Sequence, residues 1–326
     1  MIDTMIRGAV LGLATGDAMS SPSATHRVAL LAPKRAARMR SLAEYADQQK
    51  QTTRPFPYTH AQPNWMLHPG PSDDLEWFTF TAEILLSKRD PFIAWADLAA
   101  RRNEIHARNG TKIALKNLAD GLLPPQSGHD NPHYFDDIAL VRAAGIALVS
   151  KVGLEELLSQ VRTDISYTHS EDGLWGAEAI ATLIFALKGG ASIGEGIAQA
   201  VDRLPSESWA KREVTRALEL TSKSVRTLDR VMLLENDFVD RIYCYPYSSP
   251  ETLGLLFSHL RHSEDPVDTF MAAYLHRRNT DSLPPLLGFL NGLVHGDQWM
   301  PPLRDEARIL SGICIPALKG KDFLAL

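Results

Sequence analysis

Apolar residues recur with the spacing of a helix along most of this 326-residue chain. One apolar stripe follows the acidic cluster Ser72-Asp73-Asp74, and another follows Asp136-Asp137. This spacing places the apolar side chains on one helix face, which then lies against a core. Because strand patterns are scarce by comparison, helical periodicity limits the fold of this chain more than any other feature.

The predicted helices carry start and stop signals at their ends. Ser192 and Glu195 have the spacing of a capping box, and Gly189-Gly190 stops the preceding helix. Proline occupies the first helical position in Ser249-Pro250 and in Asp265-Pro266. These signals agree with the periodicity and favour helices.

The best strand signal is the tyrosine-rich segment 241–247. Its tyrosines alternate with other residues, but Pro246 argues against a central strand there. The sequence has no tandem repeat and no clean linker between equal halves. It therefore predicts an all-α protein with a single domain over residues 1–326.

The composition is that of an ordinary globular protein with a substantial core. Hydrophobic residues make up 44% of the chain and charged residues 22%. The formal net charge of -5 argues against the concentrated basic face that nucleic acid requires. A compact diphosphate remains a suitable ligand, because metal ions or helix N-termini can bind phosphate without a basic surface.

Cysteine content and targeting signals indicate the compartment. The two cysteines, Cys244 and Cys314, form no paired-cysteine motif, which argues against a disulfide framework or a zinc–cysteine site. The N-terminus lacks the regions of a signal peptide. No apolar stretch approaches the roughly 20 residues that span a bilayer. We therefore expect a cytoplasmic protein without a membrane partner.

The least regular part of the chain is the segment 25–71. It contains a basic run, 34–40, and then becomes rich in proline, aromatic residues and histidine. Long irregular segments inside a compact domain are usually functional or mobile. We expect an excursion that covers the functional site, with a surface loop packed by its own aromatic residues as the alternative.

Two clusters of oxygen-bearing side chains stand at predicted helix starts. They are Ser72-Asp73-Asp74 and Asn279-Thr280-Asp281-Ser282. Carboxylate, amide and hydroxyl oxygens are the ligands that hard cations such as Mg²⁺ and Mn²⁺ prefer, so two facing clusters could hold one or two ions. The same residue types also cap helices and suit the helix dipole, which is the alternative for each cluster alone.

A series of short motifs runs from one end of the chain to the other. In order they are residues 8–19 (GAVLGLATGDAM), Ser72-Asp73-Asp74, residues 137–148 (DIALVRAAGIAL), Thr168-His169 and Asn279-Thr280-Asp281-Ser282. They resemble, in the same order, the opening helix with its Gly-Asp-Ala turn, the Thr-Asp-Asp metal motif, the Asn-Gly-x-x-Met-Arg segment, the Thr-His pair and the Asp-x-Asp-Thr/Ser motif of the ADP-ribosylglycohydrolase family. Each motif is short, but the shared order makes the combination specific.

The resemblance implies an all-α domain with a dinuclear Mg²⁺ or Mn²⁺ centre. The implied ligands are Ser72, Asp73, Asp74 and Asp281 for one ion, and Asn279, Asp281 and Ser282 for the other, with Asp281 bridging. Paired ions can orient the anomeric carbon of a ribosyl group and lower the pKa of a bound water. Asp73 or Asp74 would then assist that water as a base.

The resemblance also implies residues around the substrate. Asp17 would be a buried acceptor, Asp137 would belong to the substrate segment, and His169 would contact the ribose or the phosphates. Two alternatives remain open from the residues alone. Asp17 would cap a turn after Gly16, or His169 would be a core histidine bonded to a backbone carbonyl.

The chain departs from the family pattern at several positions. Ala24, Asn279, Ile138 and Gly145 stand where the family usually has Glu, Asp, Gly and Pro, respectively. Asn279 removes a negative charge, which should weaken one ion site. Asp137 adds a carboxylate that repels a diphosphate unless a cation intervenes. We therefore expect a substrate other than ADP-ribosyl-protein, such as a smaller riboside.

The leading hypothesis is a divalent-metal-dependent hydrolase that cleaves the glycosidic bond at the anomeric carbon of an ADP-ribosyl or related ribosyl group. The alternatives are a hydrolase of a small nucleoside or other N-riboside, and a non-catalytic relative with a binding or structural role. The retained Ser72-Asp73-Asp74 and Asp281-Ser282 argue against the non-catalytic alternative. The expected partner is a small-molecule or protein-linked ribosyl substrate.

Overall fold

A computed structural model describes residues 4–20, 72–223, 226–240, 245–276, 278–300 and 308–325. The whole of segment 25–71 lies outside these ranges, so its expected position over the site stays a prediction. The single domain over residues 1–326 also stays a prediction.

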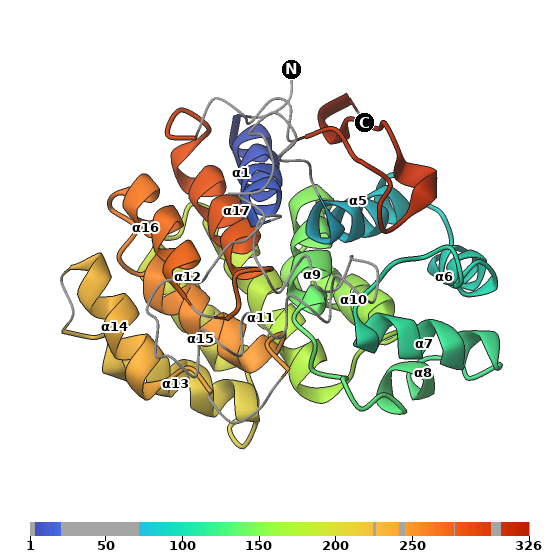
Figure 1. Cartoon of the computed structure of the whole chain (residues 1–326), viewed down its shortest axis with the longest axis horizontal. Coiled ribbons are helices and arrows are strands. Elements are labelled where there is room, and N and C mark those ends of the chain that lie inside the picture. Colours follow the sequence, from blue (N-terminus) through green and yellow to red (C-terminus); the bar gives the residue numbers. More distant parts are fainter. Residues whose placement is uncertain are drawn as a thin grey trace, which may run out of the picture.

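Helices make up the regular structure of the described residues (Figure 1). They are α1 (Thr4–Ser20), α5 (Asp73–Leu86), α6 (Pro91–Ala100), α7 (Asn109–Ala119), α8 (Gln126–His129), α9 (Ile138–Val149), α10 (Leu154–Ile165), α11 (Glu171–Lys188), α12 (Ile193–Arg203), α13 (Trp209–Leu220), α14 (Thr227–Asp237), α15 (Ser249–Leu260), α16 (Pro266–Ala272) and α17 (Leu283–His295). Short 3-10 turns follow at Ala273–Leu275, Pro316–Leu318 and Phe323–Ala325.

The prediction of an all-α protein is confirmed. In the described ranges the only β-type pairings are isolated bridges, Asp136 with Ser248 and Ile309 with Asp322. The strand signal at 241–247 leads to no strand in its described part, 245–247. Tyr245 and Tyr247 instead lie in the approach to α15 and are buried.

The predicted helix signals appear at the expected ends. At the start of α12, the Ser192 hydroxyl accepts from the Glu195 N–H while the Glu195 carboxylate accepts from the Ser192 N–H, which is a capping box. Pro250 lies in the first turn of α15, and Asp265 caps α16 next to Pro266. Local chemistry therefore sets these ends, as the sequence predicts.

The core is built around helices that are buried on nearly all sides. Every residue of α15 is buried, as are Ile138–Leu148 of α9 and Leu283–Leu293 of α17. Their apolar side chains form one cluster with those of α1, α5 and α11. Helices with one apolar face, such as α10, α12 and α13, lie around this cluster and complete it (Figure 1).

Glycines allow α1 and α17 to lie side by side with their backbones in contact (Figure 1). A Cβ on Gly12 would lie 1.9 Å from the carbonyl oxygen of Gly288, and a Cβ on Gly8 would lie 2.3 Å from that of Gly292. No side chain fits into such distances. The contact fixes the end of α1, with Asp17, against the start of α17.

The C-terminal segment is fixed to α5 by a buried carboxylate. Glu76 accepts hydrogen bonds from the N–H groups of Ile313, Cys314 and Ile315 and from the hydroxyl of Ser311. Burial raises the pKa of Glu76, although these donors oppose the shift. The thiol of Cys314 is buried and free, whereas Cys244 lies outside the described residues.

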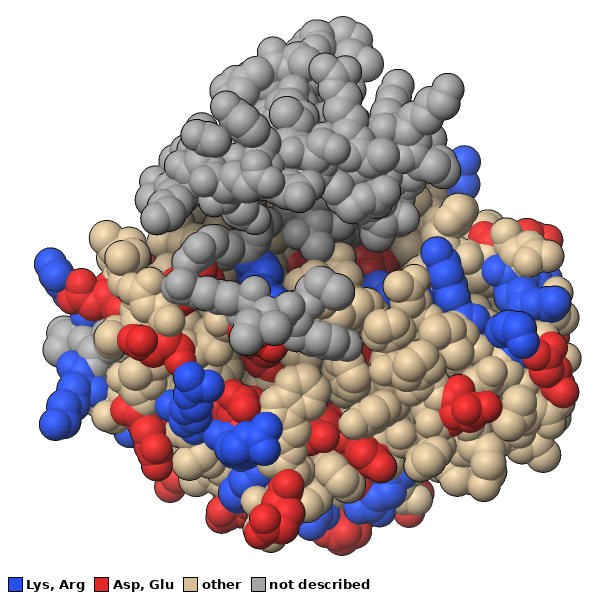
Figure 2. All heavy atoms as spheres, turned by 60° about the horizontal axis from the view of Figure 1, so that its bottom comes forward, with Lys and Arg blue, Asp and Glu red and all other residues tan. Residues whose placement is uncertain are grey.

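Acidic and basic side chains are interspersed over the described residues of the face in Figure 2. None of the described helices combines the length and the apolar character needed to cross a membrane.

Candidate functional site

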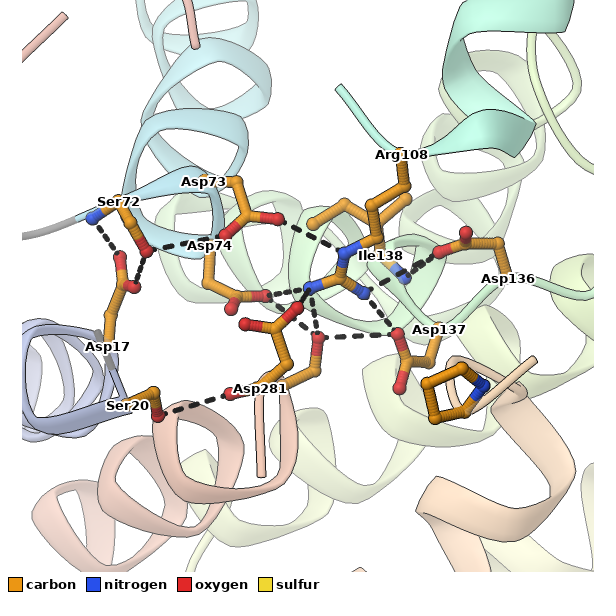
Figure 3. A network of polar contacts seen from close by, with 12 residues as sticks. Asp17, Ser20, Ser72, Asp73, Asp74, Arg108, Asp136, Asp137, Ile138 and Asp281 are labelled. Carbon is orange, nitrogen blue, oxygen red and sulfur yellow. Dashed lines mark hydrogen bonds and ion pairs between the residues drawn. The ribbon is translucent and has the colours of Figure 1, made fainter. Parts of the chain in front are cut away.

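The candidate site lies where the N-terminal ends of several helices meet (Figure 3). Asp73 and Asp74 open α5, Asp137 is the residue before α9, and Asp281 and Ser282 precede α17. The positive end of each helix dipole favours acidic side chains at these positions. Dipole complementarity, a local rule, thus favours carboxylates at helix ends that the fold then brings together, although the N-cap residues of α5, α9 and α17 make no side-chain cap hydrogen bond.

Arg108, the residue before α7, lies at the centre of these carboxylates (Figure 3). Its Nε lies 3.1 Å from Asp73. Its Nη2 lies 2.9 Å from the Ser282 hydroxyl, 3.0 Å from Asp281 and 3.4 Å from Asp74. Its Nη1 lies 3.6 Å from Asp136 and donates to Asp137. The guanidinium is therefore a single cation shared by carboxylates from three helix starts.

The charges in this cluster do not balance. Burial lowers the pKa of Arg108, but the surrounding aspartates together raise it well above its usual range, so the guanidinium stays charged. Burial, followed by the charge of Asp73, raises the pKa of Asp74 well above its usual range, and Arg108 opposes this shift. Burial also raises the pKa of Asp136 to about 7. One positive charge is thus insufficient for the carboxylates around it.

Asp17 holds the first turn of α5 in place. Its Oδ2 accepts from the backbone N–H groups of Ser72, at 2.8 Å, and Leu75, at 2.9 Å. The hydroxyl of Ser72 donates to the other carboxylate oxygen. Because α1 continues to Ser20, Asp17 lies inside a helix and does not cap a turn. It is a buried acceptor that positions Ser72-Asp73-Asp74, and its contact with substrate stays a prediction.

Asn279 lies apart from the contacts of Arg108. Its side-chain amide donates to the carbonyl oxygen of Pro246 at 3.1 Å and to the hydroxyl of Thr252 at 3.3 Å. The amide oxygen is buried without a hydrogen-bond partner. Asn279 also has a left-handed backbone, with φ of 63°. Asn279 is therefore directed toward α15, and a role as a metal ligand stays a prediction.

Asp137 and its neighbour Asp136 are held by residues from the other side of the site. Asp137 accepts from the hydroxyl of Thr252 at 2.6 Å, and Asp136 accepts from the phenol of Tyr245. The ring of Tyr247 lies against the guanidinium of Arg108, with 4.6 Å between Cζ and the ring centroid. These contacts fix the orientation of Arg108 and enclose one side of the cluster.

His169 is buried next to a second arginine. Its Nδ1 lies 2.6 Å from the Thr168 hydroxyl, which also accepts from Arg142. The Thr168 hydroxyl also lies 3.4 Å from the carbonyl oxygen of Ile165, to which it can donate, so Nδ1 either accepts from this hydroxyl or donates to it, depending on the tautomer of the ring. Nε2 is buried and has no hydrogen-bond partner. Burial, followed by the charges of Arg142 and Arg108, lowers the pKa of His169 well below its usual range.

The Asp73 and Asp74 side of the cluster has the donor set of a hard-cation site. Asp17, Asp73 and Asp74 each offer a carboxylate oxygen within 4.8 Å of the others. Oδ2 of Asp74 is buried without a hydrogen-bond partner. A buried carboxylate oxygen without a partner is costly unless a cation or a donor satisfies it. The residues present therefore fit a divalent cation here.

Several residues of the site were not expected from the sequence. They are Arg108, Asp136, Tyr245, Tyr247 and Thr252. Asp136 had a usable signal, because Asp136-Asp137 precedes a predicted helix as Asp73-Asp74 does. Arg108 had none that separates it from the other 33 of the 34 basic residues in the chain.

The arrangement of these motifs agrees with the comparison with known proteins. The family model described as ADP-ribosylglycohydrolase matches residues 2–316. Among the curated proteins, none matches the chain. The family match spans nearly the whole chain and includes every residue around Arg108. This chain therefore belongs to the ADP-ribosylglycohydrolase family.

Proposed function

We propose that this chain is a divalent-metal-dependent hydrolase that cleaves the glycosidic bond at the anomeric carbon of an ADP-ribosyl or related ribosyl group. Membership of the family supports a glycohydrolase of the ADP-ribosyl type. The observation that carries the proposal is the buried carboxylate cluster around Arg108. It holds more negative charge than its single guanidinium can balance.

The proposed cofactor is Mg²⁺ or Mn²⁺, held on the side formed by Asp73 and Asp74. Asp17 would fix both carboxylates through its bonds to the first turn of α5, and the Ser72 hydroxyl would add a neutral oxygen. A bound divalent ion supplies Lewis acidity and lowers the pKa of a water that it coordinates. The excess of carboxylates favours such an ion, because a cation at this side relieves their mutual repulsion.

Asp74 is the better of the two proposed bases. Its Oδ2 is buried and has no hydrogen-bond partner, so this oxygen is not already engaged by a donor of the protein. Asp73 is engaged by Nε of Arg108, so we assign it mainly to holding charge.

His169 would orient the substrate by donating a hydrogen bond. This role requires the tautomer in which Nδ1 accepts from the Thr168 hydroxyl and Nε2 carries the proton, and the imidazole stays neutral because burial lowers its pKa. A neutral donor in an enclosed site suits a ribose hydroxyl or a phosphate oxygen. The buried nitrogen without a partner is the structural support for this role.

The position of Asp137 bears on the size of the substrate. An added carboxylate there would repel a diphosphate unless a cation intervenes. Arg108 and Thr252 both contact the Asp137 carboxylate, so a cation does intervene. The main argument for a smaller riboside is thereby weakened, and an ADP-ribosyl group is the substrate that we favour.

The test is hydrolysis of a substrate panel by the purified full chain with Mg²⁺ or Mn²⁺. The panel contains ADP-ribosyl-arginine, ADP-ribosyl-serine, ADP-ribose esters, NAD and simple nucleosides. We expect turnover of an ADP-ribosyl substrate that is lost with a chelator and in Asp74→Ala. An exposed change of the same type, Asp97→Ala, is the control and should keep the activity.

Each other result gives a definite answer. Turnover of nucleosides alone would support the small-riboside alternative. Turnover that a chelator does not affect would contradict the metal requirement. No turnover of any substrate, with no metal bound, would favour the non-catalytic alternative.

A further inference from the structure

One atom of Arg108 lies at a point that contacts both predicted ligand clusters. Nη2 is 3.0 Å from Asp281, 2.9 Å from Ser282 and 3.4 Å from Asp74. These oxygens come from the starts of α17 and α5 (Figure 3). A Mg²⁺ ion bound to the same oxygens would lie about 2.1 Å from each. The guanidinium and such an ion would therefore occupy the same space.

We propose that Arg108 is a built-in cation that takes the place of one of the two metal ions, so that this chain binds a single divalent ion on its Asp73–Asp74 side. This inference rests on the proposed function in one respect, which is the divalent ion on the Asp73–Asp74 side. The replacement by Arg108 is a separate statement about the Asp281–Ser282 side.

The shape of the guanidinium explains why it can take this place. A flat group with five N–H donors can serve several carboxylates, and each of the three nitrogens of Arg108 contacts at least one carboxylate. The ring of Tyr247 covers one face of the group. Because these contacts already fix the Arg108 side chain, little further conformational entropy is lost when it occupies this position. An ion from solvent would have to displace it.

The other side of the cluster is left for an ion. Asp74 gives Oδ1 to Arg108 and Ser282, and its Oδ2 has no partner. Asp17 and Asp73 each bring a carboxylate oxygen within 4.8 Å of Asp74. One guanidinium leaves a surplus of negative charge, which a divalent ion at this position would reduce.

A purely structural ion pair would be built differently. Structural buried arginines need one or two carboxylates, since each further one adds desolvation and repulsion. Arg108 has five carboxylates within 3.6 Å. The carboxylates therefore have a use beyond neutralising Arg108.

The experiment counts bound Mn²⁺ per chain by equilibrium dialysis, with electron paramagnetic resonance to detect coupled ions. It compares the full wild-type chain with Arg108→Ala and Arg108→Gln. Arg89→Ala, at an exposed ion pair, is the matched control. We expect one isolated ion in the wild type and in the control, and two coupled ions in both Arg108 variants.

Two coupled ions in the wild type, or equal numbers in wild type and variants, would overturn the inference. No ion in the wild type and one in the variants would support the replacement by Arg108 and contradict the metal requirement of the proposed function. The two proposals can therefore fail separately.

A second measurement tests the proposal even if the Arg108 variants do not fold without metal. Thermal unfolding of each protein is followed with and without saturating Mn²⁺. An ion that binds only the folded state raises the midpoint, and two ions raise it more than one. We expect a larger Mn²⁺-induced shift for Arg108→Gln than for the wild type, and an equal or smaller shift would count against the replacement.

Discussion

Arg108 and Arg142 are both buried arginines that bind aspartates, and they differ in how well their charges are balanced. Arg142 of α9 has one carboxylate, Asp164, which it contacts through Nε at 3.1 Å and through Nη2. The indole of Trp95 lies against Arg142, with 4.4 Å from Cζ to the ring, and donates to Asp164 at 2.9 Å. Arg108 instead faces an excess of carboxylates.

The difference indicates which arginine stabilises the fold and which belongs to a site. Around Arg142 the donors and acceptors match, and no atom of Arg142 or Asp164 is left without a partner. Around Arg108, Oδ2 of Asp74 remains unsatisfied. Functional sites retain such unfavourable groups because binding uses them, at a cost in stability. We therefore assign a structural role to the Arg142 cluster and propose the Arg108 cluster as the ligand site.

The largest expected effect on stability is at Asp164. Asp164→Asn leaves the Arg142 guanidinium buried without a compensating charge. Breaking a buried ion pair in this way costs about 3–5 kcal/mol. Urea unfolding measures the free energy of unfolding of the variant, and added Mn²⁺ should not restore the lost stability. A loss below about 1 kcal/mol would mean that the comparison is wrong.

A smaller effect is expected from His169, which lies beside the Arg142 cluster. Its pKa is lowered in the folded protein, so below pH about 6.5 the unfolded chain binds a proton that the folded chain does not. The contribution of His169 to the free energy of unfolding is therefore fully present above pH about 6.5. It falls by about 1.4 kcal/mol for each pH unit below that value.

The measurement compares the wild type and His169→Gln by unfolding between pH 6.5 and 5.5. The variant should lose stability less steeply as the pH falls. His259, whose pKa is also lowered well below its usual range by burial, remains in both proteins. Parallel curves for the two proteins would refute the prediction.

The smallest expected effect on stability is at Asp74. Asp74→Asn removes one of the mutually repelling carboxylates, so the metal-free chain should change by no more than about 1 kcal/mol in either direction. Metal affinity or hydrolysis should fall by about 100-fold or more. A stability loss as large as that of Asp164→Asn would place Asp74 among the structural carboxylates.

Much of the fold follows from local sequence. The capping box at Ser192 and Glu195, the proline in the first turn of α15 and the acidic start of α5 each depend on neighbours a few residues away. The 241–247 signal was misleading because Tyr245 and Tyr247 are buried by contacts with Asp136 and Arg108, not by pairing in a sheet. Periodicity does not distinguish these two reasons for burial.

The sequence by itself determined the helices, the family and the carboxylates that would gather at helix starts. These follow from backbone hydrogen bonding, dipole complementarity and short motifs, which act over a few residues. Only the tertiary structure decided that Arg108, 34 positions from Asp74 and 174 from Ser282, lies between them. The reason is physical: a buried charge takes its partners from whatever the packing of α5, α7, α9 and α17 brings within about 4 Å, and no local pattern encodes that packing.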